Sequence, residues 1–370
     1  MTRYDAAVVG GGMIGSAIAY GLARRGLATV MLDEGDVAFR AARGNFGLVW
    51  VQGKGADAPA YAHWTRRSSD LWPALDAELA EATGVATGYA RRGGVEICLS
   101  QDEFDTLAAE LERLRVATNG EFSYAMHDRA GLGQYVPGLG AGVVGGSYSV
   151  LDGHVNPLAL LRALHAGFLA RGGIYRPGSR VSRISHQQPG FEIAGDGETV
   201  AAERVVLAAG LGNRALAPFV GLVAPVFPLR GEILVTEKLA PFLEVATLNL
   251  RQTVEGGCLI GASHDEAGFD DRSTGAAMAA IAGRAVTAFP ALADVQIVRS
   301  WGALRVMTRD DLPIYAQSPR CPGAFVVCGH SGVTLAAAHV TLLADWIADG
   351  TLPGEVAAFG AERFDVRDAS

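Results

Sequence analysis

The stretch that decides the fold is Asp5-Ala-Ala-Val-Val-Gly10-Gly11-Gly12-Met13-Ile14-Gly15, followed directly by Ser16-Ala-Ile-Ala-Tyr-Gly-Leu-Ala-Arg24. The apolar run predicts a buried parallel strand, the glycines a tight turn, and the alanine-rich segment a helix. Gly10 permits the turn, Gly12 lets the backbone approach a pyrophosphate, and Gly15 allows helix and strand to pack closely. The phosphates would then lie at a helix N-terminus, where free N–H groups and the positive dipole end favour anions.

A second apolar run, Thr29-Val-Met-Leu32, predicts the next strand and ends at Asp33. Its distance from the glycines matches that of a carboxylate that accepts a hydrogen bond from a ribose hydroxyl. Strand, glycines, helix, second strand and acid in this order predict a dinucleotide-binding unit. The pattern alone does not separate FAD from NAD(P), so both cofactors stay open at this point.

The bulk properties indicate a folded enzyme-sized chain. Its 370 residues are enough for two domains, and 49% hydrophobic with 19% charged residues is a globular composition. The net charge of −8 argues against a nucleic-acid surface, so any anion site must be built locally. The cysteines lie far apart without a C-x-x-C pair, which is typical of reduced thiols and predicts neither disulfides nor a metal site.

The N-terminal strand begins within the first few residues, and no apolar run approaches 18 residues. This pattern predicts neither a signal peptide nor a membrane-spanning helix. We therefore expect a cytoplasmic protein.

Further elements follow from periodicity and turn residues. Helices are predicted over 59–82 (broken or kinked at Pro73), 101–117, 158–171 and 274–289. Strands are predicted over 92–99, 180–184, 190–194, 203–210, 231–236 and 257–261, with a hairpin at Asp196-Gly197. A last strand, 324–329, leads through His330-Ser331-Gly332 into a helix predicted over 333–349. This second strand–glycine–helix junction predicts a discontinuous nucleotide-binding domain with a β-rich domain inserted, an α/β class that is α+β overall.

Several segments resemble a known superfamily. They are Val8–Gly15, Arg43-Gly-Asn-Phe-Gly47, Val205–Gly210, Pro228–Glu232, Trp301–Asp310 and Gly329–Thr334. Over nearly its whole length the chain resembles the FAD enzymes of the D-amino-acid oxidase, glycine oxidase and sarcosine oxidase superfamily. Asn45–Trp50 and Asp152–Pro157 are most similar to the branch of opine oxidase B subunits and hydrogen cyanide synthases.

The resemblance implies an FAD-binding Rossmann-like domain from residues 1–80, 150–222 and 301–370. It implies an inserted substrate-binding domain with a mixed sheet from residues 81–149 and 223–300. The residues that it places at FAD are Gly10, Gly12, Met13, Ile14, Gly15, Asp33, Glu34, Arg43, Gly44, Asn45, Phe46, Gly47, Val181, Ala209, Gly210, Arg230, Gly231, Arg305, Gly329, Ser331, Gly332, Val333 and Thr334.

Individual positions take more specific roles from the same resemblance. Asp33 would bind the ribose, and Val181 would lie beside the adenine or simply belong to a strand core. The Gly329–Thr334 junction would aim N–H groups at the flavin N1/O2 edge, where a helix N-terminus stabilises negative charge. Ala303 stands where some sarcosine oxidases carry a flavin-linking cysteine, so we expect non-covalent FAD.

Three residues are candidates for substrate binding or catalysis. Arg305 matches the arginine that pairs with the substrate carboxylate, and its planar fork fits two carboxylate oxygens and would hold the Cα–H over flavin N5. Arg251 either binds a distal carboxylate or forms a structural ion pair. His330 lies at the turn facing the flavin, as a catalytic residue or as one that only orients the loop.

The implied activity is oxidation of an amino acid or N-substituted amino acid, such as glycine, sarcosine, a D-amino acid or an opine. A hydride would pass from the carbon next to nitrogen to flavin N5, giving an imine that hydrolyses, and O2 or another acceptor would take the electrons. One alternative is an NAD(P)-linked dehydrogenase. Another is an electron-relaying subunit of a hetero-oligomeric opine dehydrogenase, so that a partner subunit or a homo-oligomer are both open.

Overall fold

The computed structural model describes residues 2–35, 41–350 and 354–364. Its N-terminal pattern folds as predicted: β1 (Arg3–Val9) leads through the glycines into α1 (Met13–Arg24), and β2 (Thr29–Leu32) follows. β1 pairs in parallel with β2 and with β11 (Val200–Leu207), and β11 pairs in parallel with β18 (Ala324–Cys328). The carboxyl ends of β1, β11 and β18 therefore meet at one edge of the sheet.

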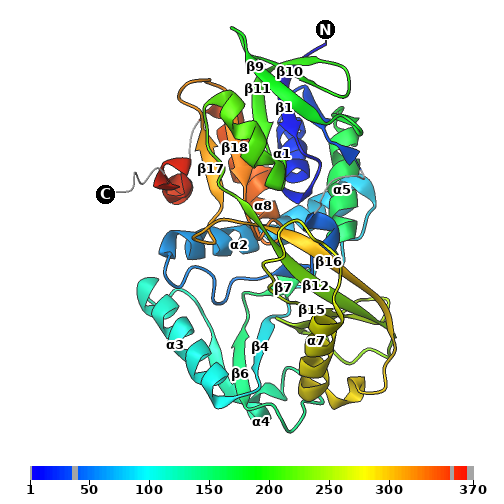
Figure 1. The fold of residues 1–370 in the computed structure, drawn as a ribbon. Helices are drawn as coiled ribbons and strands as arrows, with labels where there is room; N and C mark the ends of the chain where they lie inside the picture. Colours follow the sequence, from blue (N-terminus) through cyan, green and yellow to red (C-terminus); the bar gives the residue numbers. More distant parts are fainter. Residues whose placement is uncertain (1, 36–40, 351–353, 365–370) are drawn as a thin grey trace.

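These strands belong to an eight-stranded sheet in the upper half of Figure 1. Its other strands are β8 (Ile174–Arg176) beside β2, β17 (Ile314–Gln317) beside β18, and the pair β9 (Val181–His186) and β10 (Phe191–Gly195). β10 and β11 are antiparallel neighbours, which confirms the hairpin predicted at Asp196-Gly197. The sheet is mixed, and the fold is of the predicted α/β class.

Side chains of β1 alternate between two cores, as the pleat of a strand requires. Ala6 and Val8 pack in the core that contains α1, α2 (Pro59–Thr83), α5 (Pro157–Ala170) and the C-terminal helices. Ala7 and Val9 pack in the opposite core, which contains β9, β10 and the residues after α6 (Asn213–Leu216). The sheet is therefore buried on both faces, and its edge remains for a ligand.

Of the two outcomes predicted at Pro73, the break is wrong, because α2 continues through Pro73 to Thr83, and the kink stays a prediction. A proline removes one helix hydrogen bond, but packing on both sides of it stabilises the helix. Trp64 and Trp72 are fully buried before Pro73, and Leu75 and Leu79 are buried after it. Tertiary contacts thus outweigh the local cost of the proline.

The helix predicted over 333–349 begins later, at α8 (Ala336–Ala338), and continues through a π-helical turn (His339–Leu343) into α9 (Ala344–Asp349). Ser68 on α2 explains the delay. Its hydroxyl donates to the carbonyl of Thr334 and accepts from the N–H of Ala338, and so replaces the helical bond between these two residues. Residues 332–335 therefore form a turn.

Two further sheets occupy the lower half of Figure 1. One has the antiparallel order β14 (Leu250–Gln252), β15 (Gly257–Gly261), β12 (Phe227–Lys238), β16 (Ile297–Met307). The other has the order β13 (Ala246–Thr247), β4 (Gly94–Cys98), β6 (Gly145–Ser149), β5 (Ala125–Asp128). A short pair, β3 (Leu48–Val49) and β7 (Gly153–His154), joins residues near the middle of the molecule.

The helices of this half are α3 (Gln101–Ala117), α4 (Arg129–Leu132) and α7 (Gly275–Ala288). Their limits confirm the helices predicted over 101–117 and 274–289. Ser100 caps α3 and Thr274 caps α7 through hydrogen bonds to the backbone N–H three residues on. The division into two domains stays a prediction, and β16 runs across its boundary at residue 300.

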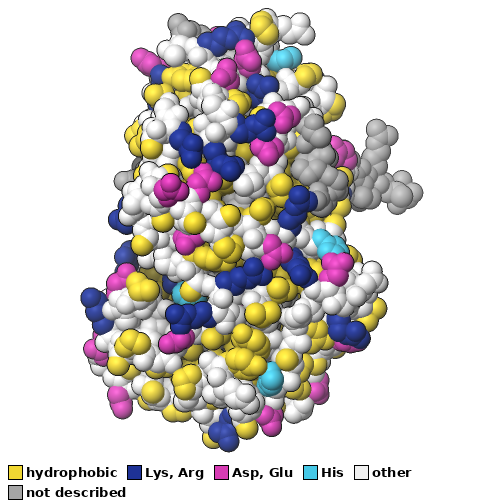
Figure 2. Space-filling model, turned by 180° about the vertical axis from the view of Figure 1, so that it is seen from behind, with side chains coloured by type: hydrophobic (Ala, Val, Ile, Leu, Met, Phe, Trp, Pro, Cys, Tyr) yellow, Lys and Arg dark blue, Asp and Glu magenta, His cyan; other side chains and the backbone are white. Residues whose placement is uncertain are grey.

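The surface carries charges of both signs. On the face shown in Figure 2, basic and acidic side chains are interspersed with hydrophobic ones. Among the described residues, we find no helix with the length and apolar character needed to cross a bilayer.

Candidate functional site

A cavity of about 670 Å³ lies at the carboxyl edge of β1, β11 and β18. Each strand contributes the turn that follows it: Gly10–Ile14 after β1, Ala208–Gly212 after β11 and Gly329–Thr334 after β18. This volume is typical of a site for a cofactor or small ligand, which spans about 300–1,000 Å³. Ligands of open α/β sheets bind in the same place, outside the carboxyl ends of the strands.

The first glycine turn is shaped for close approach of a ligand. Gly10 has φ +110°, and a Cβ there would lie 2.5 Å from the carbonyl oxygen of Ala208. A Cβ at Gly15 would overlap the carbonyl oxygen of Gly10, which is the close packing of helix and strand that the sequence predicts. At Gly12, by contrast, nothing lies within 4 Å of a Cβ, so the backbone is open to the cavity. A pyrophosphate fits here at the start of α1, which has no side-chain cap.

Asp33 lies at the same end of the cavity and is 6% exposed. Its carboxylate accepts hydrogen bonds from the N–H groups of Gly11 and Gly35, which orient it. Each carboxylate oxygen has two lone pairs, so the same group can also accept from a ribose hydroxyl. Glu34 and Val181 line the cavity beside it, at the end where the adenosine of a dinucleotide would lie.

We expect Asp33→Ala to weaken FAD retention by about 10- to 100-fold, the usual worth of a hydrogen bond to a charged group. Substrate affinity should change little, because Asp33 follows β2 and Arg305 lies in a different sheet, on β16. The measurement is the flavin-to-protein ratio after gel filtration, with KM determined in excess FAD. Full FAD occupancy in the variant would remove the ribose assignment.

The turn after β18 presents backbone donors to the cavity. Ser331 has φ +63°, which is uncommon for a residue other than glycine, asparagine or aspartate. The N–H groups of residues 331–334 donate no hydrogen bond within the described part of the chain. Successive free N–H groups in such a turn favour negative charge. The turn itself, and not the first residues of a helix as the sequence predicts, therefore supplies these donors.

Arg305 lies on β16, and its guanidinium occupies the space that a side chain at Gly231 would fill. Its Nη1 donates to the carbonyl oxygens of Ser263, at 2.9 Å, and Arg230, at 3.3 Å. No described carboxylate forms an ion pair with Arg305, and desolvation lowers the pKa of its guanidinium. One nitrogen thus anchors the fork to the backbone, while the remaining N–H groups are available to a carboxylate in the cavity.

Lys54 is a cavity residue that sequence reasoning missed. Its Nζ donates to the hydroxyl of Ser331 at 2.6 Å, and that hydroxyl lies 3.2 Å from Nδ1 of His330. Lys54 lies in the glycine-rich turn Gln52-Gly-Lys54-Gly55. A lysine in such a turn is typical of a solvated loop, so no local sequence pattern indicates a site residue here. His264 is a second missed residue beside Arg305. The end of the cavity that Arg305 lines is therefore basic.

His330 lines this basic end and stays neutral. Desolvation, with additional repulsion from Lys54, Arg305 and His264, lowers its pKa to about 3. A lowered pKa means that the neutral ring prevails at every pH above about 3. We therefore expect the pH profile of kcat/KM to have the same shape near pH 6.5 in the unaltered protein and in His330→Asn. Profiles of both proteins from pH 5 to 9 check this. An inflection lost in the variant would make His330 a titrating catalytic group.

Besides Gly15, four predicted residues lie outside the cavity lining. Arg43 is exposed, and Gly47 packs against the carbonyl of Val155. Arg230 points away from the cavity, with its guanidinium 3.6 Å from Glu232 and 3.8 Å from Asp265.

Arg251, the fourth, is 3% exposed, and its Nε donates to the carbonyl oxygen of Phe46 at 3.0 Å. Among the described residues no carboxylate pairs with it, and desolvation lowers its pKa to about 10. It thus supports the 45–47 loop from behind, in contrast to both predicted roles. The other predicted residues, apart from Gly15, all line the cavity.

Ala303 lines the cavity beside Gly44. The two residues are so close that a Cβ added at Gly44 would overlap the Cβ of Ala303. No thiol stands at this position, so we expect FAD to be held without a covalent bond. Acid precipitation should then release the flavin into the supernatant. Flavin that stays with the precipitated protein would contradict this expectation.

Comparison with known proteins agrees with this geometry. Residues 5–346 match the model of the DAO family, described as FAD dependent oxidoreductase. The chain is similar to the B subunit of opine oxidase from Rhizobium meliloti, with 43% identity over 370 residues and all of both chains covered. It is also similar to glycine oxidase of Geobacillus kaustophilus, with 28% identity over 381 residues, covering 98% of this chain and 97% of the relative.

The crystal structure of glycine oxidase from Geobacillus kaustophilus superposes with a TM-score of 0.89 at 26% identity, covering 98% of this chain and 99% of the other. These matches confirm the superfamily and branch predicted from the sequence, and they decide between FAD and NAD(P) in favour of FAD. The chain belongs to the DAO family of FAD-dependent oxidoreductases, and FAD is its cofactor.

Proposed function

We propose that this enzyme oxidises the C–N bond of an amino acid or N-substituted amino acid, including those of opine type. Bound FAD supplies the acceptor for a hydride from the carbon next to nitrogen. The observation that carries the proposal is Arg305, a guanidinium at the cavity that is anchored through one nitrogen and has no carboxylate partner among the described residues. The full-length similarity to the opine oxidase B chain and to glycine oxidases supports the same substrate class.

The basic end of the cavity selects the charge state of the substrate. The fork of Arg305 fixes both oxygens of a carboxylate, which sets the direction of the neighbouring C–H bond. Burial is the main cause of the lowered pKa values of His330 and His264, and the positive charge of Arg305 lowers both further. Lys54 adds to this positive potential at His330. This potential disfavours a protonated amine, so the substrate binds with the free electron pair on nitrogen that its oxidation requires.

An anaerobic screen of amino acids and opines tests the proposal, with bleaching of the flavin band as the readout. We expect bleaching by one or more of these compounds. The methyl ester of an active compound and its 2-hydroxy analogue should leave the band unchanged, because they lack the carboxylate or the nitrogen. Equal bleaching by the ester, or bleaching by compounds without nitrogen only, would contradict the proposal.

We also propose that the chain works with a second, different subunit. Two relatives at 43% and 42% identity over their full length are named as the B subunit of opine oxidase, and that name supports the proposal. The isolated chain should then reduce its flavin with substrate yet release little peroxide under air. Peroxide formed in proportion to substrate by the isolated chain would argue for a self-sufficient oxidase.

A further inference from the structure

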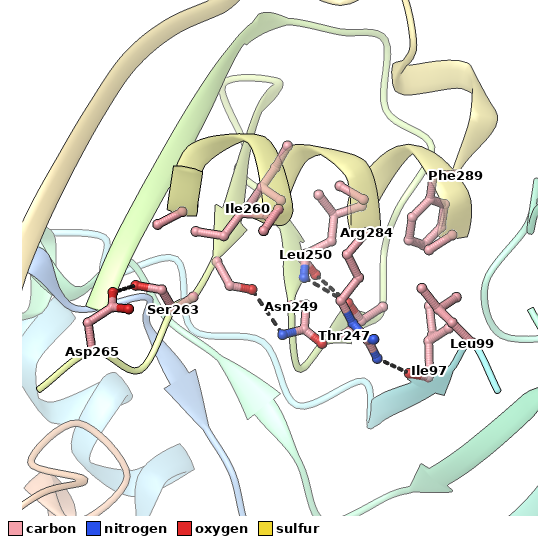
Figure 3. Close-up of a pocket in the computed structure, with 17 residues that line it drawn as sticks. Ile97, Leu99, Thr247, Asn249, Leu250, Ile260, Ser263, Asp265, Arg284 and Phe289 are labelled. Atoms are coloured by element: carbon pink, nitrogen blue, oxygen red, sulfur yellow. Dashed lines mark hydrogen bonds between the residues drawn. The ribbon is translucent and has the colours of Figure 1, made fainter. Parts of the chain in front are cut away.

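A second cavity, of about 290 Å³, lies between α7 and the strands β14 and β15 (Figure 3). It is roughly twice the size of a cavity of about 150 Å³ that can bind benzene. No step of the proposed oxidation involves this second cavity. It lies next to the end of the first cavity that Arg305 lines.

The two cavities share a thin wall. Asn249, Gly261 and Ala262 line both of them. Along the segment after β15, Ser263 faces the second cavity and His264 faces the first. The two spaces therefore meet along this segment, and Arg305 contacts it, because its Nη1 donates to the carbonyl oxygen of Ser263 at 2.9 Å. A carboxylate held by Arg305 would therefore lie directly beside the second cavity.

The walls of the second cavity are apolar because of the residues that α7 presents. Alanines 277, 280, 285 and 288 face it and are too short to reach the opposite strands, which leaves the space open. The larger apolar side chains of the lining are those of Ile97, Leu99, Leu250, Ile260, Ile281 and Phe289. Side chains that line an empty apolar space lack dispersion contacts on that side, so an apolar occupant is favoured.

The charged groups at the margin of the second cavity are already paired. Arg284 extends from α7 toward β4 in Figure 3, donates to both carboxylate oxygens of Glu103 at 2.8 and 2.9 Å, and donates to the carbonyl of Ile97. At the other end, Asp265 accepts a hydrogen bond from the hydroxyl of Ser263 at 2.6 Å, and Nε of Arg230 lies 3.8 Å from the same carboxylate. These pairs leave no unmatched charge for an ionic ligand, so the chemistry favours an aliphatic one.

We propose that the second cavity receives the aliphatic arm of the substrate while Arg305 holds the carboxylate. This inference rests on the proposed function. Asn249 lines both spaces, and its Nδ2 donates to the carbonyl of Gly261 at 2.9 Å, so the arm would pass beside this side chain. The cavity under α7 thereby determines specificity, because substrates with a long carbon chain bind more tightly than glycine-sized ones.

Inert carboxylates test this inference on the FAD-loaded protein without turnover. The probes are acetate, propionate, butyrate and pentanoate, and perturbation of the flavin spectrum gives each Kd. Each added methylene should tighten binding about fourfold, since burying one CH₂ is worth about 0.8 kcal/mol. Ala277→Leu and Ala280→Leu, which fill the cavity, should abolish this gain and leave the Kd of acetate unchanged. Ala279→Leu, exposed on the same helix and outside the lining, is the matched control and should keep the gain.

Three results would overturn the inference. The first is a Kd that does not depend on chain length in the unaltered protein. The second is a dependence on chain length that survives in both filled variants. The third is an equal weakening of acetate and pentanoate binding in the filled variants, which would assign the cavity to access or to stability. Failure of the proposed function is separate, because it would appear as a flavin that no amine substrate bleaches while the graded binding of carboxylates persists.

Discussion

Arg305→Lys raises the KM for a carboxylate substrate by about 10- to 100-fold, while FAD stays bound. A lysine offers a single point charge in place of two parallel N–H donors, and hydrogen bonds to charged groups contribute about 1.5–3 kcal/mol. Lysine is also too different in shape to keep the bond that Arg305 makes to the carbonyl of Ser263. Arg305→Met should cost more, because it also removes the positive charge that the carboxylate needs.

The control for this prediction lies on the same strand. Arg299 on β16 is exposed, stacks on Trp301 and lies outside the cavity lining, so Arg299→Lys should leave KM unchanged. Steady-state kinetics and the flavin absorbance of each variant provide both readouts. An unchanged KM in Arg305→Lys would remove this residue from substrate binding, and loss of FAD from it would place the residue at the cofactor.

Gly12→Val is expected to produce a folded protein whose affinity for FAD is more than about tenfold weaker, a loss of at least about 1.4 kcal/mol. Gly12 has extended backbone angles, φ −77° and ψ −170°, which valine adopts readily. No protein atom lies within 4 Å of a Cβ at this position, so the chain itself accommodates the substitution. The added methyl groups would project into the cavity, where the pyrophosphate must approach the backbone.

Gly283→Val serves as the matched control, because it also meets no atom within 4 Å but lies on α7, away from the FAD cavity. It should keep full flavin content. Flavin content after gel filtration and thermal unfolding of the apoprotein separate binding from folding. A Gly12→Val protein with full flavin content would mean that the pyrophosphate does not pass over this turn.

The sequence was sufficient where one residue type has one structural use. Gly10, Gly12 and Gly15 predict the first turn correctly because each meets a different demand: positive φ, an open backbone and close packing. The second junction was placed at the right edge of the sheet because its strand reads as a buried parallel strand. What sequence could not reveal was the start of the helix, since Ser68 on a distant helix displaces it from residue 333 to residue 336.

The substrate end was harder to predict, because contacts between distant segments create it. Lys54 enters the site only because its turn packs against Ser331, 277 positions later. Asn249 matters because it borders two cavities, which no periodicity records. Arg251 stood in a promising pattern, yet the fold turns it toward the carbonyl of Phe46. The positions of these residues therefore depend on tertiary structure.

A crystal structure of the protein with FAD and a substrate-like carboxylate would show directly whether Arg305 binds the substrate beside the cofactor. We expect both carboxylate oxygens to lie about 2.7–2.9 Å from nitrogens of Arg305. We also expect FAD to extend from Asp33 to the turn at residues 331–334. A carboxylate bound elsewhere, or a guanidinium of Arg305 turned to solvent in that complex, would contradict substrate binding by Arg305.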